Sequence, residues 1–425
     1  MGNLIQRDKN AVWHPFTQWN SVPDPIPVVK GEGVYLYTTD GKKIIDAISS
    51  WWVNIHGHGN KTIAEAVARQ AATLEHVIFA NFTHEPAIEL AENVLSILPP
   101  EQSKVFYSDD GSTSVEVALK MAFQYWYNQG IKKTKVIAID GAYHGDTFGS
   151  MSVGDRDIFV EPFAPFLFDV ESIPFPTPDN EDQVLSVFED ILRSGNVASF
   201  IFEPLLQGSG GMRTYDPGIL DKLIAMAKAN DVICIADEVL TGFGRTGKLF
   251  ASLYLEHKPD IFCLSKALTG GTLALGVTTC SQKIVEAYRS EEAAKTFFHG
   301  HSFTANPIAC AAANASFKLL MEKSCLDNIQ RIAAQHAQFN EWLQTQPGVK
   351  ASRCLGTMLS LEVQTPGETS YFNEIRHRVF PFFVERGVLL RPLGNVIYIL
   401  PPYIIENEEL EHIYDTIRQF LADLP

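Results

Sequence analysis

The sequence predicts an α/β protein in which a mostly parallel sheet is covered by helices on both faces. Short runs of β-branched and aromatic residues alternate with helical patterns through the middle of the chain, as in repeated strand–helix–strand units. Because the runs are short and apolar, we expect them to form buried strands. The six runs are 104–107, 136–139, 199–202, 232–236, 261–264 and 275–279.

A helix is predicted between the first two of these strands. Apolar residues recur there at the spacing of one helical face, and the pattern stops near Gly130, a residue type that often follows helices. The recurring residues are Val117, Ala118, Met121, Ala122 and Tyr125. This helix is expected to belong to one of the layers that cover the sheet.

The two ends of the chain predict a different arrangement, with antiparallel strands. Asp40-Gly41 separates two apolar runs, which indicates a hairpin. The predicted strands are 33–37, 43–46, 356–363 and 388–400, the last broken by a turn at Gly394-Asn395. A final helix with one apolar face follows, formed by Leu410, Ile413, Tyr414, Ile417, Phe420 and Leu421. We expect the N-terminal piece to join this C-terminal α+β part.

Composition excludes several classes of partner. The 425 residues suggest two or three domains, and the net charge of −16 with no basic run argues against nucleic acid or an anionic membrane. The six cysteines are scattered without CxxC or Cys/His ligand spacing, so we expect reduced thiols and no metal site. No apolar run approaches the ~20 residues of a membrane span. These features predict a soluble cytoplasmic protein.

Lys266 and Asp237 are the most informative residues of the chain. Lys266 lies just beyond the apolar run 261–264, and Asp237 directly follows 232–236. Residues that close buried parallel strands project into the crevice at the carboxyl edge of the sheet. An amine that forms a Schiff base and a carboxylate that keeps a pyridinium nitrogen protonated are what pyridoxal phosphate (PLP) requires. Taken singly, a solvated lysine and a helix-capping aspartate are the simpler interpretation.

Residues 108–114 join a predicted strand to the predicted helix. Backbone N–H groups at the helix N-terminus, the turn at Gly111 and the Ser112 hydroxyl would form an anion site. A purely structural role is equally open, because many strand–helix junctions carry serine and threonine caps. No GxGxxG or GxxxxGK[ST] motif occurs, which argues against nucleotide binding.

Three further loops follow predicted strands. Tyr143, after 136–139, could stack on a planar cofactor, although a structural role is also open. Glu203 closes 199–202 and is a candidate either to support the site or to cap a helix. Residues 236–247 contain three glycines and two threonines, the permissive backbone of a loop that shapes a site.

Four segments together resemble the class III PLP-dependent aminotransferases of fold type I. They are DDGSTS at 109–114, AYHGDTFG at 142–149, IADEVLTGFGRTG at 235–247 and LSKALTGG at 264–271. Their order and intervals are similar to those of the family over essentially the whole chain. The resemblance implies a large PLP-binding domain (56–315) with a mostly parallel seven-stranded sheet. It also implies a smaller α+β domain formed by both termini (1–55 and 316–425).

The resemblance also implies roles for individual residues. Lys266 would be the Schiff-base lysine and Asp237 the partner of the pyridine nitrogen. Gly111 and Ser112 would hold the phosphate, and Tyr143 would stack on the ring. Ser302 would reach the phosphate of the neighbouring subunit's cofactor, which implies a homodimer with active sites at the interface.

Within the family, three segments are similar to those of members that act in biotin biosynthesis: WHPFT at 13–17, SSWWVNIHG at 49–57 and PPYII at 401–405. This likeness implies amino transfer from S-adenosyl-L-methionine to 8-amino-7-oxononanoate, giving 7,8-diaminononanoate. Trp51 would line the pocket for the long-chain substrate, and Arg391 would hold its terminal carboxylate. Phe16 and Gly300 would contact substrate as well.

Two positions depart from the family. Most members have tyrosine where this chain has Phe16, and Gly-Pro-Thr where it has Gly300-His301-Ser302. The amino donor is therefore open, with lysine as the alternative for the same acceptor. A class III aminotransferase acting on another ω-amino acid, such as 4-aminobutyrate or ornithine, is the nearest rival. A PLP-free interaction protein is a third reading, against which the lysine and aspartate argue.

Overall fold

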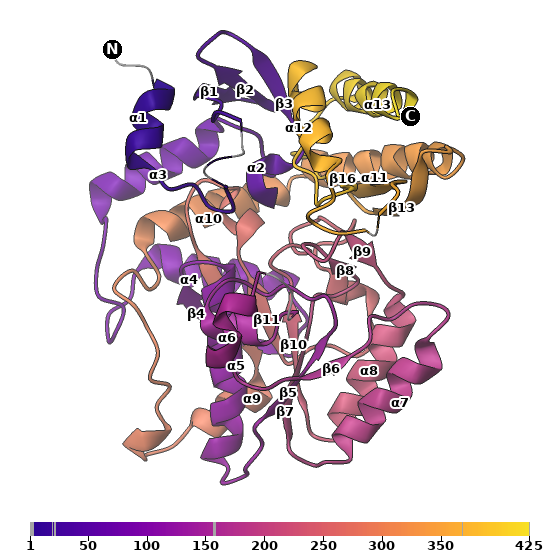
Figure 1. Cartoon of the computed structure of the whole chain (residues 1–425). Coiled ribbons are helices and arrows are strands. Elements are labelled where there is room, and N and C mark those ends of the chain that lie inside the picture. Colours follow the sequence, from indigo (N-terminus) through magenta and orange to yellow (C-terminus); the bar gives the residue numbers. More distant parts are fainter. Residues whose placement is uncertain (1–3, 19, 21–22, 156–158, 368, 425) are drawn as a thin grey trace.

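The computed structural model describes residues 4–18, 20, 23–155, 159–367 and 369–424. Its centre is a seven-stranded sheet in the order β4-β12-β11-β10-β7-β5-β6 (Figure 1). Pairing is parallel from β11 to β6, whereas β12 is antiparallel to both β11 and β4. The strands are β4 (Gln102–Ser108), β5 (Lys135–Ile139), β6 (Glu171–Ile173), β7 (Val197–Phe202), β10 (Ile233–Asp237), β11 (Ile261–Leu264) and β12 (Gly276–Ser281).

The prediction of a mostly parallel sheet is confirmed. Each of the six predicted strands is present, with its ends displaced by two residues or fewer. The seventh strand, β6, was not predicted, because Glu171-Ser172-Ile173 is three residues long and contains two polar side chains. Its pairing with β5 supplies the hydrogen bonds that so short a segment cannot make alone.

Both faces of the sheet are buried, as the run of apolar residues in each strand predicts. Along β10, Ile233 and Ile235 pack into one core with helix α5 (Gly111–Asn128), and Cys234 and Ala236 pack into the other core. Asp237 continues the alternation of Ile233 and Ile235. Its side chain therefore leaves the sheet on the α5 face.

The helices of this large α/β part pack around the central sheet (Figure 1). They are α3 (Lys61–Thr73), α4 (Glu85–Ile97), α5 (Gly111–Asn128), α6 (Phe148–Ser152), α7 (Glu181–Leu192), α8 (Pro217–Ala229), α9 (Gln282–Tyr288) and α10 (Pro307–Leu320). Four short 3₁₀ turns accompany them: η1 (Glu161–Phe166), η2 (Ala251–Tyr254), η3 (Lys266–Thr269) and η4 (Ala293–Lys295). The helix predicted up to Gly130 is α5.

The two ends of the chain meet in a second, smaller sheet with the order β1-β2-β3-β15. Its last strand pairs in parallel with β3, which joins the N-terminal hairpin to the C-terminal part. The strands are β1 (Val28–Glu32), β2 (Tyr35–Thr38), β3 (Lys43–Asp46) and β15 (Val388–Leu389). This pairing supports the proposed domains, although the boundaries at residues 55 and 315 stay a prediction.

A three-stranded antiparallel sheet completes the C-terminal part. Residues 388–400 do not form one strand: β15 belongs to the terminal sheet and β16 to this one, separated by Pro392 and by the turn at Gly394 (φ +62°). The strands are β13 (Val349–Leu355), β14 (Met358–Val363) and β16 (Val396–Ile399); β8 (Leu206–Gln207) and β9 (Arg213–Thr214) form a separate ribbon.

Helices α11 (Lys323–Leu343), α12 (Arg376–Glu385) and α13 (Asn407–Ala422) pack around these sheets, and α1 (Leu4–Ala11) and the short α2 (Ser49–Trp52) lie in the N-terminal segment (Figure 1). The predicted apolar face of the last helix is confirmed, with Leu410, Ile413 and Ile417 buried. Within the described ranges, no helix combines the length and apolarity needed to cross a membrane.

A buried histidine makes the stability of the C-terminal part depend on pH. His336 donates from Nε2 to the Thr357 carbonyl (3.1 Å) and accepts at Nδ1 from the Tyr414 hydroxyl (2.6 Å). Burial lowers its pKa from 6.5 to about 3. Its stabilising effect is thus present above pH 6.5 and is lost as the pH falls through 6.5 toward 3.

We predict that His336→Gln destabilises the protein at pH 7.5 but less so at pH 5. The wild type loses about 2 kcal/mol of unfolding free energy at pH 5 from this group, because its unfolded state binds a proton that the folded state does not. Urea unfolding of both proteins at the two pH values measures the difference. His412→Gln, at an exposed ring, is the control. If the difference in unfolding free energy between the wild type and His336→Gln is the same at both pH values, the assignment is contradicted.

Candidate active site

Five strands that point the same way end at one edge of the large sheet. The loops after β4, β5, β7, β10 and β11 meet there and line a cavity of about 880 Å³. Eight of the ten predicted site residues line it: Phe16, Trp51, Gly111, Ser112, Tyr143, Asp237, Lys266 and Arg391. Their gathering follows from strand direction, since each functional loop leaves the sheet at its carboxyl end.

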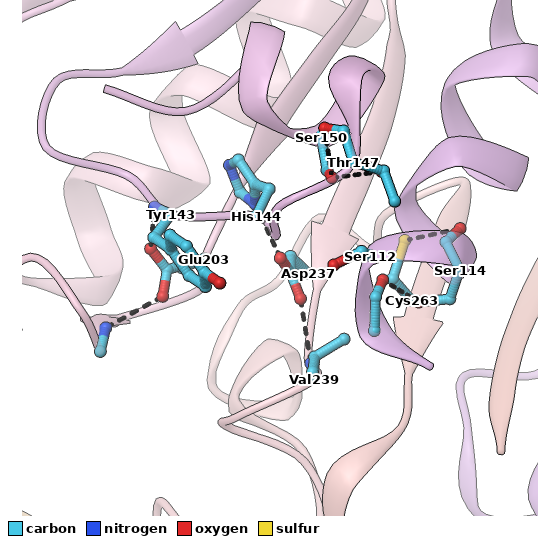
Figure 2. A network of polar contacts seen from close by, with 12 residues as sticks. Ser112, Ser114, Tyr143, His144, Thr147, Ser150, Glu203, Asp237, Val239 and Cys263 are labelled. Carbon is cyan, nitrogen blue, oxygen red and sulfur yellow. Dashed lines mark hydrogen bonds and ion pairs between the residues drawn. The ribbon is translucent and has the colours of Figure 1, made fainter. Parts of the chain in front are cut away.

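Asp237 is a buried carboxylate at the end of β10, 5% exposed. Its Oδ2 lies 2.7 Å from Nδ1 of His144, and its Oδ1 accepts from the Val239 N–H at 3.1 Å. Figure 2 shows these two partners on opposite sides of the carboxylate. The two contacts fix its orientation toward the cavity, so the simple helix-capping reading does not describe this residue.

His144 is a functional residue that sequence reasoning missed. Its ring is buried, and Nε2 has no hydrogen-bond partner among the residues that the structure describes. The signal was present in the sequence as the histidine beside Tyr143, but only the fold brings the end of β10 to the loop after β5. A histidine in this position orients the carboxylate and adds a donor next to it.

Lys266 begins the turn η3 directly beyond β11. Its φ angle of +30° lies in the left-handed region, which is strained for a residue with a side chain. Its Nζ lies 4.6 Å from the centre of the Trp52 ring. Burial lowers the pKa of this amine, while the charges of Asp237 and Glu203 act in the opposite direction. A lowered pKa leaves more of the amine unprotonated, the form that acts as a nucleophile.

The predicted anion site lies at the start of α5. The first-turn N–H groups of Gly111 and Ser112 have no partner inside the helix and point out of its N-terminus. The Ser112 hydroxyl accepts from the Asp146 N–H at 3.1 Å. A Cβ on Gly145 (φ +130°) would overlap the Ser112 hydroxyl, so glycine is needed for the two loops to approach. The arrangement is a compact cradle for a phosphate.

The backbone of Tyr143 is held by Glu203. The Tyr143 N–H donates to Glu203 Oε1 at 3.0 Å, and the Gly208 N–H donates to Oε2 at 2.9 Å (Figure 2). Burial raises the pKa of Glu203 to about 7, and the nearby charge of Asp237 adds to the effect. Glu203 is thus a support for the site, one of the two roles left open by the sequence.

Aromatic rings form the outer wall of the cavity. Phe16 packs edge-on against Trp51 at 5.8 Å and against Phe159 at 6.3 Å between ring centres. Phe159 in turn contacts Tyr371 at 4.9 Å. Phe159 and Tyr371 were not predicted, because they come from separate irregular segments with no recognisable pattern. The wall is suited to the apolar body of a substrate.

Arg391 lies beside this wall with its charge uncompensated. Its guanidinium is 5.0 Å from the Trp51 ring, and it takes part in none of the ion pairs formed among the described residues. A half-buried arginine next to an aromatic ring, without a protein partner, is suited to binding a carboxylate of a ligand.

Gly300 and Ser302 do not line this cavity. They lie in the loop before α10, where His301 Nε2 approaches Asp109 Oδ1 at 3.2 Å. The His301 ring also accepts from the Phe303 N–H, so this departure from the family has a partner in the phosphate-site loop. The role of Ser302 in a neighbouring subunit's site stays a prediction.

A buried amine of lowered pKa, a buried carboxylate and a phosphate cradle at one sheet edge define an enzyme that works through a lysine and a phosphorylated cofactor. The chain belongs to the class-III aminotransferase family, whose "Aminotransferase class-III" pattern matches residues 17–421.

Known proteins are similar to it over nearly the full length. The adenosylmethionine-8-amino-7-oxononanoate aminotransferase of Synechococcus elongatus is 47% identical over 421 residues, covering 97% of this chain and 99% of that protein. The structure of the enzyme of the same name from Methanocaldococcus jannaschii is 35% identical and covers 99% of both chains, with a TM-score of 0.93. An amine transaminase from an uncultivated Pseudomonas species, solved in the PLP-bound form, is 27% identical with a TM-score of 0.90, covering 97% of this chain and 98% of that one.

The residues of the pocket fit PLP. The N-terminus of α5 and the close glycine loop suit its phosphate, and Asp237 offers a fixed carboxylate to a ring nitrogen. Lys266 offers an amine that burial keeps reactive. A Cβ on Gly111 would lie 2.7 Å from a Val239 methyl group, so glycine is also needed where the helix meets the loop after β10.

We predict that Asp237→Asn retains PLP but lowers turnover by about a hundredfold or more. An amide cannot stabilise a protonated pyridine nitrogen, so the ring withdraws electrons less strongly. Steady-state kinetics of PLP-loaded protein measure the loss. Asp221→Asn, at another aspartate paired with a histidine, is the control. Turnover close to that of the wild type would show that Asp237 is only structural.

Proposed function

We propose that the protein is a PLP-dependent aminotransferase of biotin biosynthesis. It transfers the amino group of S-adenosyl-L-methionine to 8-amino-7-oxononanoate and forms 7,8-diaminononanoate. The observation that carries the reaction class is the meeting of Lys266 and Asp237 in one cavity with the phosphate cradle. The names of relatives at 35–47% identity support this particular reaction.

The chain's own groups divide the work. When bound, PLP supplies a conjugated ring that stabilises negative charge at the substrate carbon. Asp237 would keep the ring nitrogen protonated, and His144 orients that carboxylate. As a free amine, Lys266 Nζ would accept the proton from the amine-bearing carbon of the donor. In the second half-reaction it delivers a proton to the carbon of the acceptor that carried the ketone.

The acceptor is proposed from the chemistry of the outer wall. Its apolar chain would pack on Trp51, Phe16 and Phe159, and its terminal carboxylate would pair with Arg391. The pairing is strong in this setting because the guanidinium is partly buried beside the Trp51 ring, where water competes less for it. An ω-amino acid with a short chain would use little of this wall.

The remaining parts of the proposal concern assembly and location. We infer a homodimer, because the loop that carries Ser302 presents exposed aromatic residues: Phe298 and Phe303 are both at least 60% exposed. A partner subunit that covered them would place Ser302 near its own phosphate cradle. The six free cysteines support a cytoplasmic location.

The test of function is the formation of 7,8-diaminononanoate by PLP-loaded protein with each candidate donor. We expect product with S-adenosylmethionine and a rate at least about a hundredfold lower with lysine, 4-aminobutyrate or ornithine, since binding must match both substrates. Mass spectrometry measures the product. Product with lysine alone would correct the donor, and the absence of product with every donor would overturn the proposal.

Lys266→Ala tests the reaction class directly. We expect no measurable turnover and an intact fold, because the change removes the nucleophile and proton carrier but little packing. Circular dichroism checks the fold, and retention of PLP after gel filtration checks the remaining contacts. Full activity in a folded Lys266→Ala protein would contradict the assignment.

Arg391→Ala tests the acceptor. We expect KM for 8-amino-7-oxononanoate to rise by the equivalent of about 2–4 kcal/mol, because a desolvated ion pair is broken. Arg391→Lys should restore part of the loss, since an ammonium group lacks the bidentate fork. Single-turnover kinetics of each half-reaction separate acceptor from donor. If Arg391→Ala slows both half-reactions equally, a general ω-aminotransferase is the better interpretation.

A further inference from the structure

The turn that carries both pocket tryptophans has a backbone conformation that side chains rarely adopt. The φ angles are +51° at Ser49, +59° at Ser50 and +68° at Trp52. The left-handed region is disfavoured for residues with a Cβ, and such strain persists only where the surrounding structure holds it. The element α2 is therefore a held turn rather than a helix, with non-helical angles at Ser50 and Trp51.

Asp46, the last residue of β3, holds the centre of this turn. Its Oδ1 accepts from the Ser50 N–H at 2.8 Å, and its Oδ2 accepts from the Ser50 hydroxyl at 2.8 Å. His58 Nε2 lies 2.9 Å from the same Oδ2, and the Asn54 amide donates to the other nitrogen of that ring at 3.0 Å. Asp46 is fully buried, so loss of a partner would leave part of a buried charge unpaired.

Trp52 is fixed independently of Asp46. Its carbonyl accepts from Arg245 Nη2 at 3.2 Å, and its indole N–H donates to the Tyr398 hydroxyl at 3.0 Å. Its ring is 4% exposed. We therefore expect the Trp52 ring, which lies beside Lys266, to keep its position when the conformation of Ser50 changes.

The position of the Trp51 side chain depends on the turn more strongly than that of Trp52. Its ring is 42% exposed, so core packing does not determine its position. Among the described residues, Asp46 is the sole side-chain partner of Ser50, the residue that precedes Trp51. The conformation of Ser50 sets the direction in which the chain enters Trp51, whose ring contacts Phe16 and lies 5.0 Å from the Arg391 guanidinium.

We propose that Asp46 is a positioning residue for the acceptor: by holding Ser50 in the left-handed region it places Trp51 beside Arg391. The apolar body and the carboxylate of one long-chain acid can then be bound together. This inference rests on the proposed function and deepens it, because it assigns acceptor selection to a residue that does not line the cavity.

Asp46→Asn is the first test, in PLP-loaded protein. The amide keeps one acceptor for the Ser50 N–H but turns an N–H₂ group toward the Ser50 hydroxyl and His58. We expect kcat/KM for 8-amino-7-oxononanoate to fall at least about tenfold, mainly through KM, equivalent to about 1.4 kcal/mol. The half-reaction with S-adenosylmethionine should change less than about threefold, because Trp52 and Lys266 keep their places.

A second substitution separates backbone conformation from general damage. Asp46→Asn/Ser50→Gly should recover at least about threefold of the lost kcat/KM, because glycine adopts positive φ without steric penalty. Ser50→Val should reproduce the acceptor defect with Asp46 intact, since a β-branched residue strongly disfavours that region. Ser50 is exposed, so this variant carries the test if Asp46→Asn fails to fold.

A readout without cofactor or substrate follows the turn itself. In protein labelled with 5-fluorotryptophan, the ¹⁹F signal of Trp51 is assigned by its absence in Trp51→Phe. We expect that signal to shift or broaden in cofactor-free Asp46→Asn and to return toward its original position in the double variant. The signal of Trp52, assigned in the same way, should change little.

Asp221→Asn is the matched control. Asp221 accepts from two backbone N–H groups and pairs with His257 at 2.8 Å, but it lies outside the cavity lining. We expect no change in either half-reaction. Equal losses in both half-reactions of Asp46→Asn, absence of rescue by glycine, or an unchanged Trp51 signal would each overturn the proposal. If the wild-type protein does not react with 8-amino-7-oxononanoate, the proposed function is refuted instead. The ¹⁹F measurement would still test the turn.

Discussion

Coverage of the central sheet by helices on both faces concentrates the chemistry of this protein at one edge. Residues inside the central strands are buried in two apolar cores, where an unpaired charged side chain would be costly, so the charged groups of the site stand at or just beyond strand ends. Lys266 and Asp237 occupy such ends on neighbouring parallel strands. Strand direction alone therefore brings an amine and a carboxylate to one cavity, and the other loops of the site are placed by the same rule.

The polar groups of the site are buried, and their charged forms are less stable there than they would be in water. Burial lowers the pKa of Lys266 and raises that of Glu203 to about 7, so both charged forms are disfavoured. The backbone carries strain as well, with positive φ at Lys266 and along Ser49–Trp52. Hydrogen bonds hold these conformations, through Glu203 in the cavity lining for the Tyr143 loop and through Asp46 outside it for the tryptophan turn. Preorganisation of this kind means that binding a substrate need not reorder the site.

The two halves of the pocket have different origins in the chain. The cofactor half comes from loops of the large sheet, whereas the outer wall combines Phe159 with Phe16, Trp51, Tyr371 and Arg391, which lie in segments nearer the two ends of the chain. Pairing of β3 with β15 holds those end segments together. Changes in the wall, for example at Phe16, can therefore alter substrate choice without disturbing the lysine and aspartate.

The sequence by itself determined six strands of the large sheet, the lysine and aspartate at two strand ends and the loop before α5, because each is encoded by a local run: an apolar strand and the polar residues that follow it. Tertiary structure decided what local patterns do not contain. The short strand β6 exists through its pairing with β5. Residues 388–400 divide between two sheets, and His144 reaches Asp237 across 93 positions of sequence. Phe159, Tyr371 and the clamp at Asp46 likewise depend on contacts between distant segments, since a side chain's partners are set by packing and not by its neighbours in the chain.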